Sequence, residues 1–198
     1  MAKTILGAWW ERLRGRLEPT PCPFSAADQL EMPVRSLVAS PRRVLGAFGL
    51  TEGERALEIG PGIGYYSVEA ARRIGPTGRL ICLDLQREML GGTRRRLGAA
   101  DLTANLLEAS ALSLPLRSAS IDHVFLITVL GELPDRATGL GEIRRVLRPG
   151  GHLSVSEQFP DPDFITKGAL RRELSEAGFG EETTSGLLWY TSTWRAPS

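Results

Sequence analysis

The sequence predicts an α/β protein with a doubly wound, mostly parallel sheet that carries helices on both faces. From Arg55 onward, short apolar stretches alternate with helical stretches, the order that builds parallel strands joined by helices. A glycine-rich segment, residues 60–64, follows the first apolar stretch. The length of 198 residues, with 42% hydrophobic and 24% charged residues, suits a single core rather than two.

Local signals justify each element in chain order. Ser40 followed by Pro41 is typical of a helix start, and Gly49 of a helix end. Residues 148–151, Arg-Pro-Gly-Gly, predict a turn, and Thr166 can cap a helix that Gly178 ends. The expected strands are residues 56–59, 79–84, 105–108, 121–128, 152–157, 181–184 and 188–195, of which the last two form a hairpin. The expected helices of this region are residues 67–74, 86–97, 136–147 and 166–177.

The first part of the chain has a different character. Residues 2–17 form an apolar and basic helical stretch, and a proline-rich break follows at residues 19–23. We therefore expect residues 1–44 to be an N-terminal helical extension, a candidate lid, and residues 45–198 to be the main domain. Trp9 and Trp10 in this extension could cover a site, dock on the core or anchor the chain at a membrane interface.

Charge and composition exclude several classes of function. The 24 basic and 23 acidic residues leave a formal net charge of +1, which gives no long-range attraction for nucleic acid. No apolar run approaches the roughly 20 residues of a membrane-spanning helix, and the first 30 residues lack a signal-peptide pattern. Two cysteines are compatible with a reducing compartment. These observations predict a cytoplasmic protein without a membrane span or a nucleic-acid partner.

Ligands of open parallel sheets bind beyond the carboxyl ends of the strands, so residues at expected strand ends are candidates for a site. Asp84 ends the second strand, 24 residues after Gly60, where a carboxylate can accept hydrogen bonds from a ribose diol. Asp84 could also cap the following helix, and the two roles are compatible. Tyr65 occupies the third glycine position of the dinucleotide fingerprint, which disfavours a nicotinamide dinucleotide.

Several motifs in a fixed order now point to a family. They are Ala-Leu-Glu-Ile-Gly-Pro-Gly-Ile-Gly at residues 56–64, Asp84, Leu114-Pro115, Ser-Ile-Asp-His-Val at residues 120–124 and Val-Leu-Arg-Pro-Gly-Gly at residues 146–151. With these motifs the sequence resembles class I S-adenosylmethionine-dependent methyltransferases, and most of all the small-molecule branch that includes ubiquinone and menaquinone biosynthesis enzymes. The resemblance covers roughly residues 45–197.

The resemblance implies a Rossmann-like sheet of seven strands with the last strand antiparallel, and S-adenosylmethionine as cofactor. Gly60, Gly62 and Gly64 would flank the methionine portion, and Glu58 would lie beneath it. Asp84 would hold the ribose, and Leu85 would lie against the adenine. The full expected cofactor-binding set is Glu58, Gly60, Gly62, Gly64, Asp84, Leu85, Ser110, Ala111 and Thr128.

One position departs from the family pattern. Relatives usually carry an aspartate before the Ala-x-x-Leu-Pro segment, and its carboxylate receives the adenine amino group. Ser110 stands at this place, so its hydroxyl would offer a neutral hydrogen bond instead.

The remaining candidates concern catalysis and metals. Glu132, after the fourth strand, is a candidate general base, or alternatively a solvated acid or the cap of the next helix. Tyr65 and Tyr66 fit packing or cofactor contacts. His123 and His152 fit structural roles, since neither has a cysteine or carboxylate partner at ligand spacing and His152 is expected at the opposite edge of the sheet. We therefore expect no metal site.

The function expected from these observations is transfer of a methyl group from S-adenosylmethionine to a small-molecule acceptor. An alternative is a regulatory or interaction protein that binds the cofactor without turnover. A nicotinamide-dependent reductase is a third hypothesis, which the position of Tyr65 disfavours.

Overall fold

The computed structural model describes residues 39–198. The expected helical stretch at residues 2–17, with Trp9 and Trp10, lies outside the described residues. Within the described part, no helix is long and apolar enough to cross a membrane.

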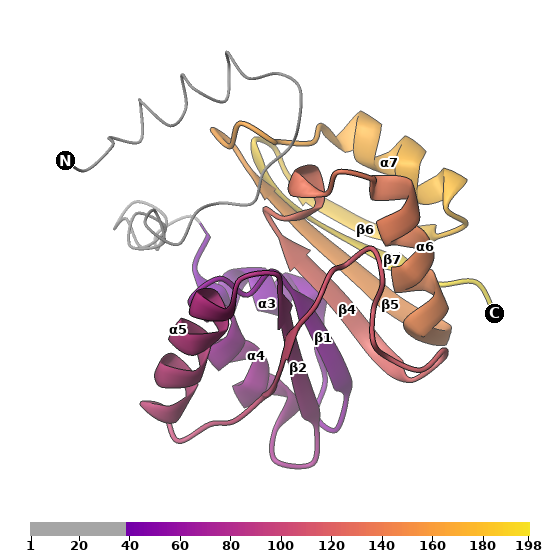
Figure 1. Cartoon of the computed structure of the whole chain (residues 1–198). Helices are drawn as coiled ribbons and strands as arrows, with labels where there is room; N and C mark the ends of the chain where they lie inside the picture. Colours follow the sequence, from indigo (N-terminus) through magenta and orange to yellow (C-terminus); the bar gives the residue numbers. More distant parts are fainter. Residues whose placement is uncertain (1–38) are drawn as a thin grey trace.

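A single seven-stranded sheet forms the centre of the molecule, with helices on both of its faces (Figure 1). The strand order is β3-β2-β1-β4-β5-β7-β6, and β7 is antiparallel to both of its neighbours while the other pairs are parallel. The strands are β1 (Arg55–Ile59), β2 (Arg79–Asp84), β3 (Asn105–Glu108), β4 (Ile121–Ile127), β5 (Leu147–Gln158), β6 (Gly180–Gly186) and β7 (Trp189–Arg195). The predicted fold class is confirmed, including the antiparallel last strand.

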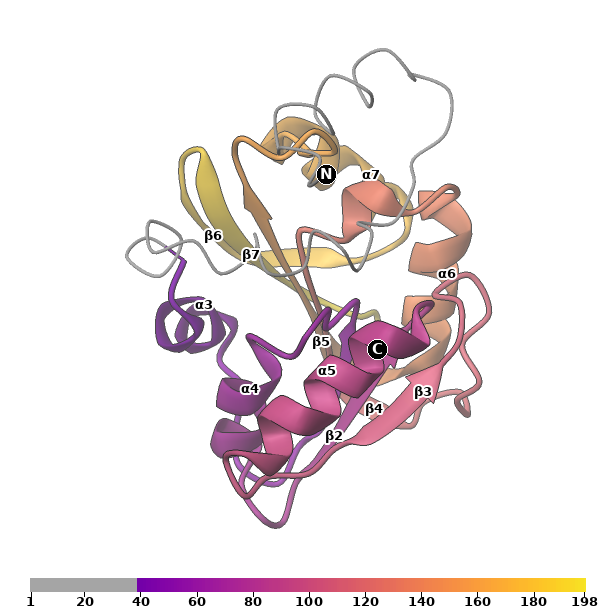
Figure 2. The same ribbon diagram turned by 60° about the vertical axis from the view of Figure 1, so that its left-hand side comes forward.

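The helices form two layers, one on each side of the sheet (Figure 2). The helices are α3 (Pro41–Phe48), α4 (Ser67–Ile74), α5 (Arg87–Gly98), α6 (Arg136–Val146) and α7 (Lys167–Glu176), with a 3₁₀ turn η2 (Leu130–Glu132) before α6. Strand β4 contributes side chains to both layers, because successive side chains of a strand point to opposite faces of the sheet. Phe125 belongs to the cluster that includes α3 and α4 residues, whereas Val124 and Leu126 belong to the cluster that includes α6 and α7 residues.

Helix α3 begins and ends where the sequence predicts. Pro41 is its first residue, and Gly49 ends it with a φ of 73°, a conformation that glycine adopts without strain. The helix buries Leu45 and Phe48, and Phe48 packs on Phe125 of β4 with ring centroids 6.0 Å apart. The expected domain boundary at residue 45 therefore lies within a helix that packs on the sheet.

The expected turn at residues 148–151 is instead part of a strand. β5 begins at Leu147, which pairs with Ile121, and the register shifts before the next pair. Gly150 has a φ of 69°, and Gly151 leaves no room for a side chain because a Cβ would lie 3.0 Å from the Asp122 carbonyl oxygen. The two glycines allow an irregular strand where the local pattern indicated a turn.

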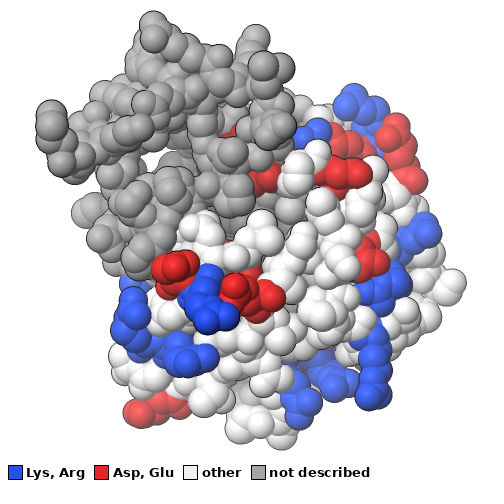
Figure 3. Space-filling view, in the orientation of Figure 1, with Lys and Arg blue, Asp and Glu red and all other residues white. Residues whose placement is uncertain are grey.

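Acidic and basic side chains are interspersed on the face shown in Figure 3. Many arginines of the helices pair with a nearby carboxylate. Examples are Arg136 with Glu173 and Arg145 with Glu142, each at 2.7 Å between nitrogen and oxygen. This mixing agrees with the balanced composition of the sequence.

Candidate cofactor and active site

The carboxyl ends of β1, β2 and β4 meet at the middle of the sheet. β1 pairs with β2 on one side and with β4 on the other, so the direction of strand addition reverses at β1. This is the position at which open α/β sheets bind ligands. The expected site residues at these strand ends are therefore brought together in space.

The three glycines after β1 have positive φ angles, of 69° at Gly60, 56° at Gly62 and 82° at Gly64, but different surroundings. A Cβ on Gly60 would lie 2.5 Å from the Val129 side chain, and one on Gly64 would lie 2.9 Å from the Thr93 Cα. A Cβ on Gly62 would meet no described atom within 4 Å. Gly60 and Gly64 are therefore required by packing, whereas the position that a Gly62 side chain would take is open within the described residues.

Hydrogen bonds hold the glycine-rich loop in place. The Gly60 amide donates to the Leu83 carbonyl at 2.8 Å, and the Thr93 hydroxyl donates to the Gly62 carbonyl at 2.8 Å. These bonds attach the loop to β2 and α5 without a contribution from a ligand. Such preorganisation lowers the entropic cost of binding.

Glu58 lies beneath this loop and is only 3% exposed. Its carboxylate accepts a hydrogen bond from the Ser67 hydroxyl at 2.5 Å and one from the Cys82 thiol at 3.6 Å. Burial raises the pKa of Glu58 to about 7, and the nearby charge of Asp84 adds to the rise, while the Ser67 and Cys82 hydrogen bonds oppose it. Glu58 thereby ties β1 to the first residue of α4 and positions the loop between them.

Asp84 ends β2 and is 9% exposed. Its Oδ1 accepts the Gln86 amide at 2.9 Å, and Gln86 is the N-cap residue of α5, so part of the expected capping role is present. Burial raises the pKa of Asp84, and backbone hydrogen bonds from Gln86, Gly62 and Leu85 oppose the rise. The neighbouring Leu85 is 55% exposed, which leaves an apolar surface available to a flat ring.

Ser110 and Ala111 follow β3, beside Asp84, where the Ala109 amide donates to the Asp84 carbonyl at 3.1 Å. The Ser110 Oγ accepts the Leu112 amide at 3.1 Å, so the hydroxyl stabilises its own turn and retains its hydrogen for donation. Ala111 is 4% exposed and packs in the core.

Thr128 follows β4 and has a φ of 55°, which is uncommon for a residue other than glycine and is typical of functional positions. Two hydrogen bonds, one from its amide and one from its side chain, hold the residue. Its amide donates to the Ser156 carbonyl at 2.8 Å, and its hydroxyl donates to the Ile127 carbonyl at 2.7 Å.

Glu132 ends the η2 turn and is half-buried. It is not the cap of α6, because Asp135 takes that position and accepts the Thr138 amide at 3.0 Å. Gly131 before it has no space for a Cβ, since the Asp163 carbonyl occupies that position. The segment around Asp163 therefore packs directly against the turn that carries Glu132.

Glu157, near the carboxyl end of β5, is a candidate that the strand-end argument did not select. It is 1% exposed, and its Oε1 has no hydrogen-bond partner within residues 39–198. Burial raises the pKa of Glu157 to about 8, and the charges of Asp161, Glu132 and Asp163 add to the rise. The signal in the sequence was an acidic residue at the end of an apolar strand.

His123 lies on β4 and His152 on β5, away from the glycine-rich loop, as the sequence predicts. The two residues are direct neighbours, because they pair in register across these strands. The expectation that neither histidine has a carboxylate partner is wrong, since Glu54 Oε2 lies 3.7 Å from His123 Nδ1. Sequence spacing could not reveal this cluster, because Glu54 precedes β1 while His123 and His152 belong to β4 and β5, far from it in the chain. It lies near the amino ends of the strands, away from the glycine-rich loop.

A surface groove of about 600 Å³ runs between α6 and α7, with Leu140, Arg144 and Glu173 among its lining residues. None of its lining residues belongs to the expected cofactor-binding set. We therefore place the candidate site at the strand ends and not in this groove.

Comparisons with known proteins agree with this geometry. A family model described as "Methyltransferase domain" matches residues 57–155, half of the chain. An uncharacterized 37.1 kDa protein in transposon TN4556 of Streptomyces fradiae is 35% identical over 168 residues, which cover 84% of this chain and 48% of that relative. Demethylmenaquinone methyltransferase of Staphylococcus aureus is 30% identical over 110 residues, which cover 56% and 45% of the two chains.

The crystal structure of an S-adenosylmethionine-dependent methyltransferase from Aquifex aeolicus superposes with a TM-score of 0.81 at 23% identity, over 89% of this chain and all of that one. The chain spans about half of the length of the curated relatives that it matches. The family model and the shared fold lead to one conclusion: the chain belongs to the methyltransferase domain family, within the class I S-adenosylmethionine-dependent methyltransferases.

Proposed function

We propose that the protein transfers a methyl group from S-adenosylmethionine to a small-molecule acceptor. The observation that carries the proposal is the pairing of Gly62 with Asp84 at the reversal point of the sheet. The side-chain position of Gly62 is open within the described residues, its conformation suits glycine, and its backbone bonds to the buried Asp84 carboxylate. This supports a site for a ligand that combines a ribose diol with a group requiring close backbone approach.

The donor set fits the cofactor. The Asp84 carboxylate accepts backbone hydrogen bonds from Gln86, Gly62 and Leu85, and because a carboxylate has about four acceptor positions, about one remains for a ribose hydroxyl. Leu85 offers an exposed apolar side chain to the adenine, and Ser110 and Ala111 lie beside Asp84 on the next strand end. Gly60, Gly64 and Glu58 contribute by keeping the loop in shape.

S-adenosylmethionine, when bound, supplies an activated methyl group on a sulfonium. The protein then has to hold the acceptor in line with that group, and positioning alone can contribute about 7–11 kcal/mol. The strained Thr128 and the η2 turn with Glu132 border the space beyond β4 where we place the acceptor.

An acceptor that loses a proton would need a base. We assign this role to Glu132, the candidate base of the sequence, which is the more accessible of the two glutamates at the carboxyl ends of β4 and β5 and would contact the acceptor. The charge of Glu132 contributes, after burial and the charge of Asp161, to the raised pKa of Glu157. With a pKa of about 8, the buried Glu157 is protonated near neutral pH and is not itself the base.

The experiment that tests the proposal combines binding with turnover. Calorimetry with S-adenosylmethionine, S-adenosylhomocysteine and NADH should show binding of the first two and none of NADH. Incubation with S-adenosylmethionine and a panel of metabolites should release S-adenosylhomocysteine only when an acceptor is present. Tight cofactor binding without release for any acceptor would favour the regulatory alternative.

Replacing Asp84 with alanine should weaken S-adenosylmethionine binding by about 1.5–3 kcal/mol for each charge-assisted hydrogen bond that is lost. The physical reason is that the ribose hydroxyl loses its hydrogen bond to the Asp84 carboxylate and can bond only to water in its place. Calorimetry measures the effect. Glu108→Ala is a matched control, because this exposed carboxylate ends the neighbouring strand and pairs with Arg87 at 2.7 Å. Equal affinity of the Asp84 variant and the control would remove Asp84 from the site.

Replacing Ser110 with aspartate should tighten S-adenosylhomocysteine binding about fivefold, because a carboxylate acceptor contributes roughly 1 kcal/mol more than a hydroxyl. A carboxylate can also keep the bond that Ser110 accepts from the Leu112 amide. Ser110→Ala is the control and should bind more weakly than the parent. If alanine binds as well as serine while aspartate binds worse, Ser110 does not contact the adenine.

A further inference from the structure

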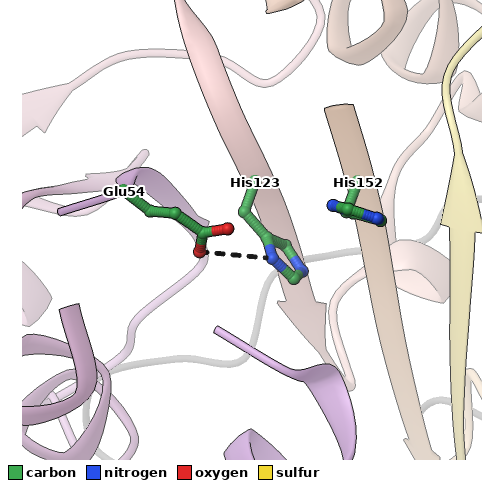
Figure 4. Close-up of side chains that lie close together, drawn as sticks. All are labelled: Glu54, His123 and His152. Carbon is green, nitrogen blue, oxygen red and sulfur yellow. Dashed lines mark ion pairs between the residues drawn. The ribbon is translucent and has the colours of Figure 1, made fainter. Parts of the chain in front are cut away.

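A cluster of two histidines and a carboxylate lies at the end of the strands opposite to the glycine-rich loop. Its members are Glu54, just before β1, His123 on β4 and His152 on β5. One ligand atom from each residue lies within 4.8 Å of the others. In Figure 4 the His123 ring lies between the Glu54 carboxylate and the His152 ring. Register produces the cluster, because His123 and His152 are directly paired across β4 and β5.

His123 is the central member and is 1% exposed. Its Nε2 lies 2.8 Å from the Ser154 hydroxyl, which lies 2.9 Å from the Thr193 hydroxyl. Its Nδ1 is buried and has no hydrogen-bond partner within residues 39–198. A buried imidazole nitrogen without a partner is costly and requires an explanation.

The distance between His123 Nδ1 and the Glu54 carboxylate leaves space for an ion larger than a proton. At 3.7 Å, the Nδ1 to Oε2 separation is too long for a hydrogen bond. When Nε2 donates to Ser154, Nδ1 directs its lone pair at a carboxylate oxygen, and two acceptors face each other. A metal ion between them would satisfy Nδ1 and would share Oε2 with the Thr51 amide, which donates to it at 3.0 Å. The separation is close to that of two ligands of a tetrahedral zinc ion, about 3.3 Å.

We propose that Glu54, His123 and His152 bind a divalent transition metal, with Zn²⁺ as the ion that suits this donor set. Two imidazoles and one carboxylate are a known zinc ligand combination that leaves the fourth position to water. His152 is the most exposed member, with 28% of its side chain accessible, so an ion can enter the cluster from its side.

The surrounding charges favour a cation. Glu182 Oε2 lies 3.3 Å from the His152 Nε2, which adds a second carboxylate next to the cluster. Arg195 pairs with Glu182 at 2.5 Å and compensates one negative charge. With neutral imidazoles, Glu54, Glu182 and Arg195 leave a net charge of −1 at the site. The ion would connect the entry of β1 to β4 and β5 and would act independently of the cofactor.

The test uses the full chain without an affinity tag, treated with a chelator and then titrated with ZnCl₂ by calorimetry. The parent should bind one Zn²⁺ per chain. Glu54→Gln and His152→Ala should each weaken Zn²⁺ binding more than roughly 100-fold. Loss of a residue that only hydrogen-bonds to a metal ligand typically costs about 10- to 100-fold, so a larger loss indicates a direct ligand. Glu52→Gln is the matched control, because Glu52 is an exposed carboxylate two residues from Glu54, and it should bind like the parent.

Two further measurements complete the test. The thermal unfolding midpoint of each variant, measured after chelation, shows whether that variant folds. Because His152 is partly exposed, His152→Ala should fold even if Glu54→Gln does not, so the proposal can still be tested with one folded variant. Titration with CoCl₂ should give the visible bands of a tetrahedral nitrogen and oxygen site without a sulfur charge-transfer band. A parent that binds no stoichiometric Zn²⁺, equal binding by all variants or a sulfur band would overturn the proposal.

Discussion

Gly62→Val is expected to reduce S-adenosylmethionine affinity about 10- to 100-fold while the protein still folds, because the added side chain enters the space that the ligand needs. No described atom lies within 4 Å of the new Cβ, so backbone strain is the main expected cost to the protein without ligand. At a φ of 56° this strain amounts to about 1–2 kcal/mol. Calorimetry and chemical denaturation measure the two effects separately.

Gly64→Ala is the matched comparison and should behave in the opposite way. Its Cβ would lie 2.9 Å from the Thr93 Cα, and its φ is 82°. Strain and overpacking together should lower the free energy of unfolding by about 2–5 kcal/mol. If Gly62→Val binds the cofactor like the parent, the loop has another role and the proposed site is wrong.

Glu157→Gln is expected to remove most of a large pH dependence of stability. The pKa of Glu157 is raised in the folded state from 4.5 to about 8, so the folded protein holds this proton more tightly than the unfolded chain does. The resulting contribution is complete below pH 4.5 and is lost as the pH rises through about 8. Its size is on the order of 5 kcal/mol. Glutamine resembles the protonated acid at every pH.

Urea denaturation at pH 5 and pH 9 measures this effect. The parent should be several kcal/mol less stable at pH 9, and Glu157→Gln should lose much less stability between the two values. A smaller dependence should remain from Glu58, whose pKa is raised to about 7 by burial in the same direction. Glu176→Gln, at an exposed helix position, should keep the parent's dependence. A parent with equal stability at both pH values would contradict the prediction.

The two candidate sites can be tested independently because they lie at opposite ends of the strands. Gly62 and Asp84 follow the carboxyl ends of β1 and β2, whereas Glu54 precedes β1. A Glu54 variant that loses Zn²⁺ should therefore retain cofactor binding. Likewise, failure of the Asp84 variant to show an effect would leave the metal proposal intact.

Most of the fold was predictable because its signals are local. Caps and breakers such as Ser40-Pro41, Thr166 and Gly178 determine helix ends within a few residues. Apolar runs mark buried strands, and the strand-end rule selected Gly62, Asp84 and Thr128 without coordinates. The predicted start of β5 at residue 152 was wrong, because the Pro-Gly-Gly segment forms an irregular strand but has the same local sequence pattern as a turn.

By itself, the sequence determined the order of the elements, the fold class and the position of the glycine-rich loop, since each depends on neighbouring residues in the chain. The tertiary structure alone decided which of the three loop glycines faces open space, because that depends on Val129 and Thr93 from other elements. It also decided that Glu157 is buried with a raised pKa and that the two histidines meet Glu54. Burial, charge proximity and strand register arise from contacts between residues far apart in sequence, which no local pattern encodes.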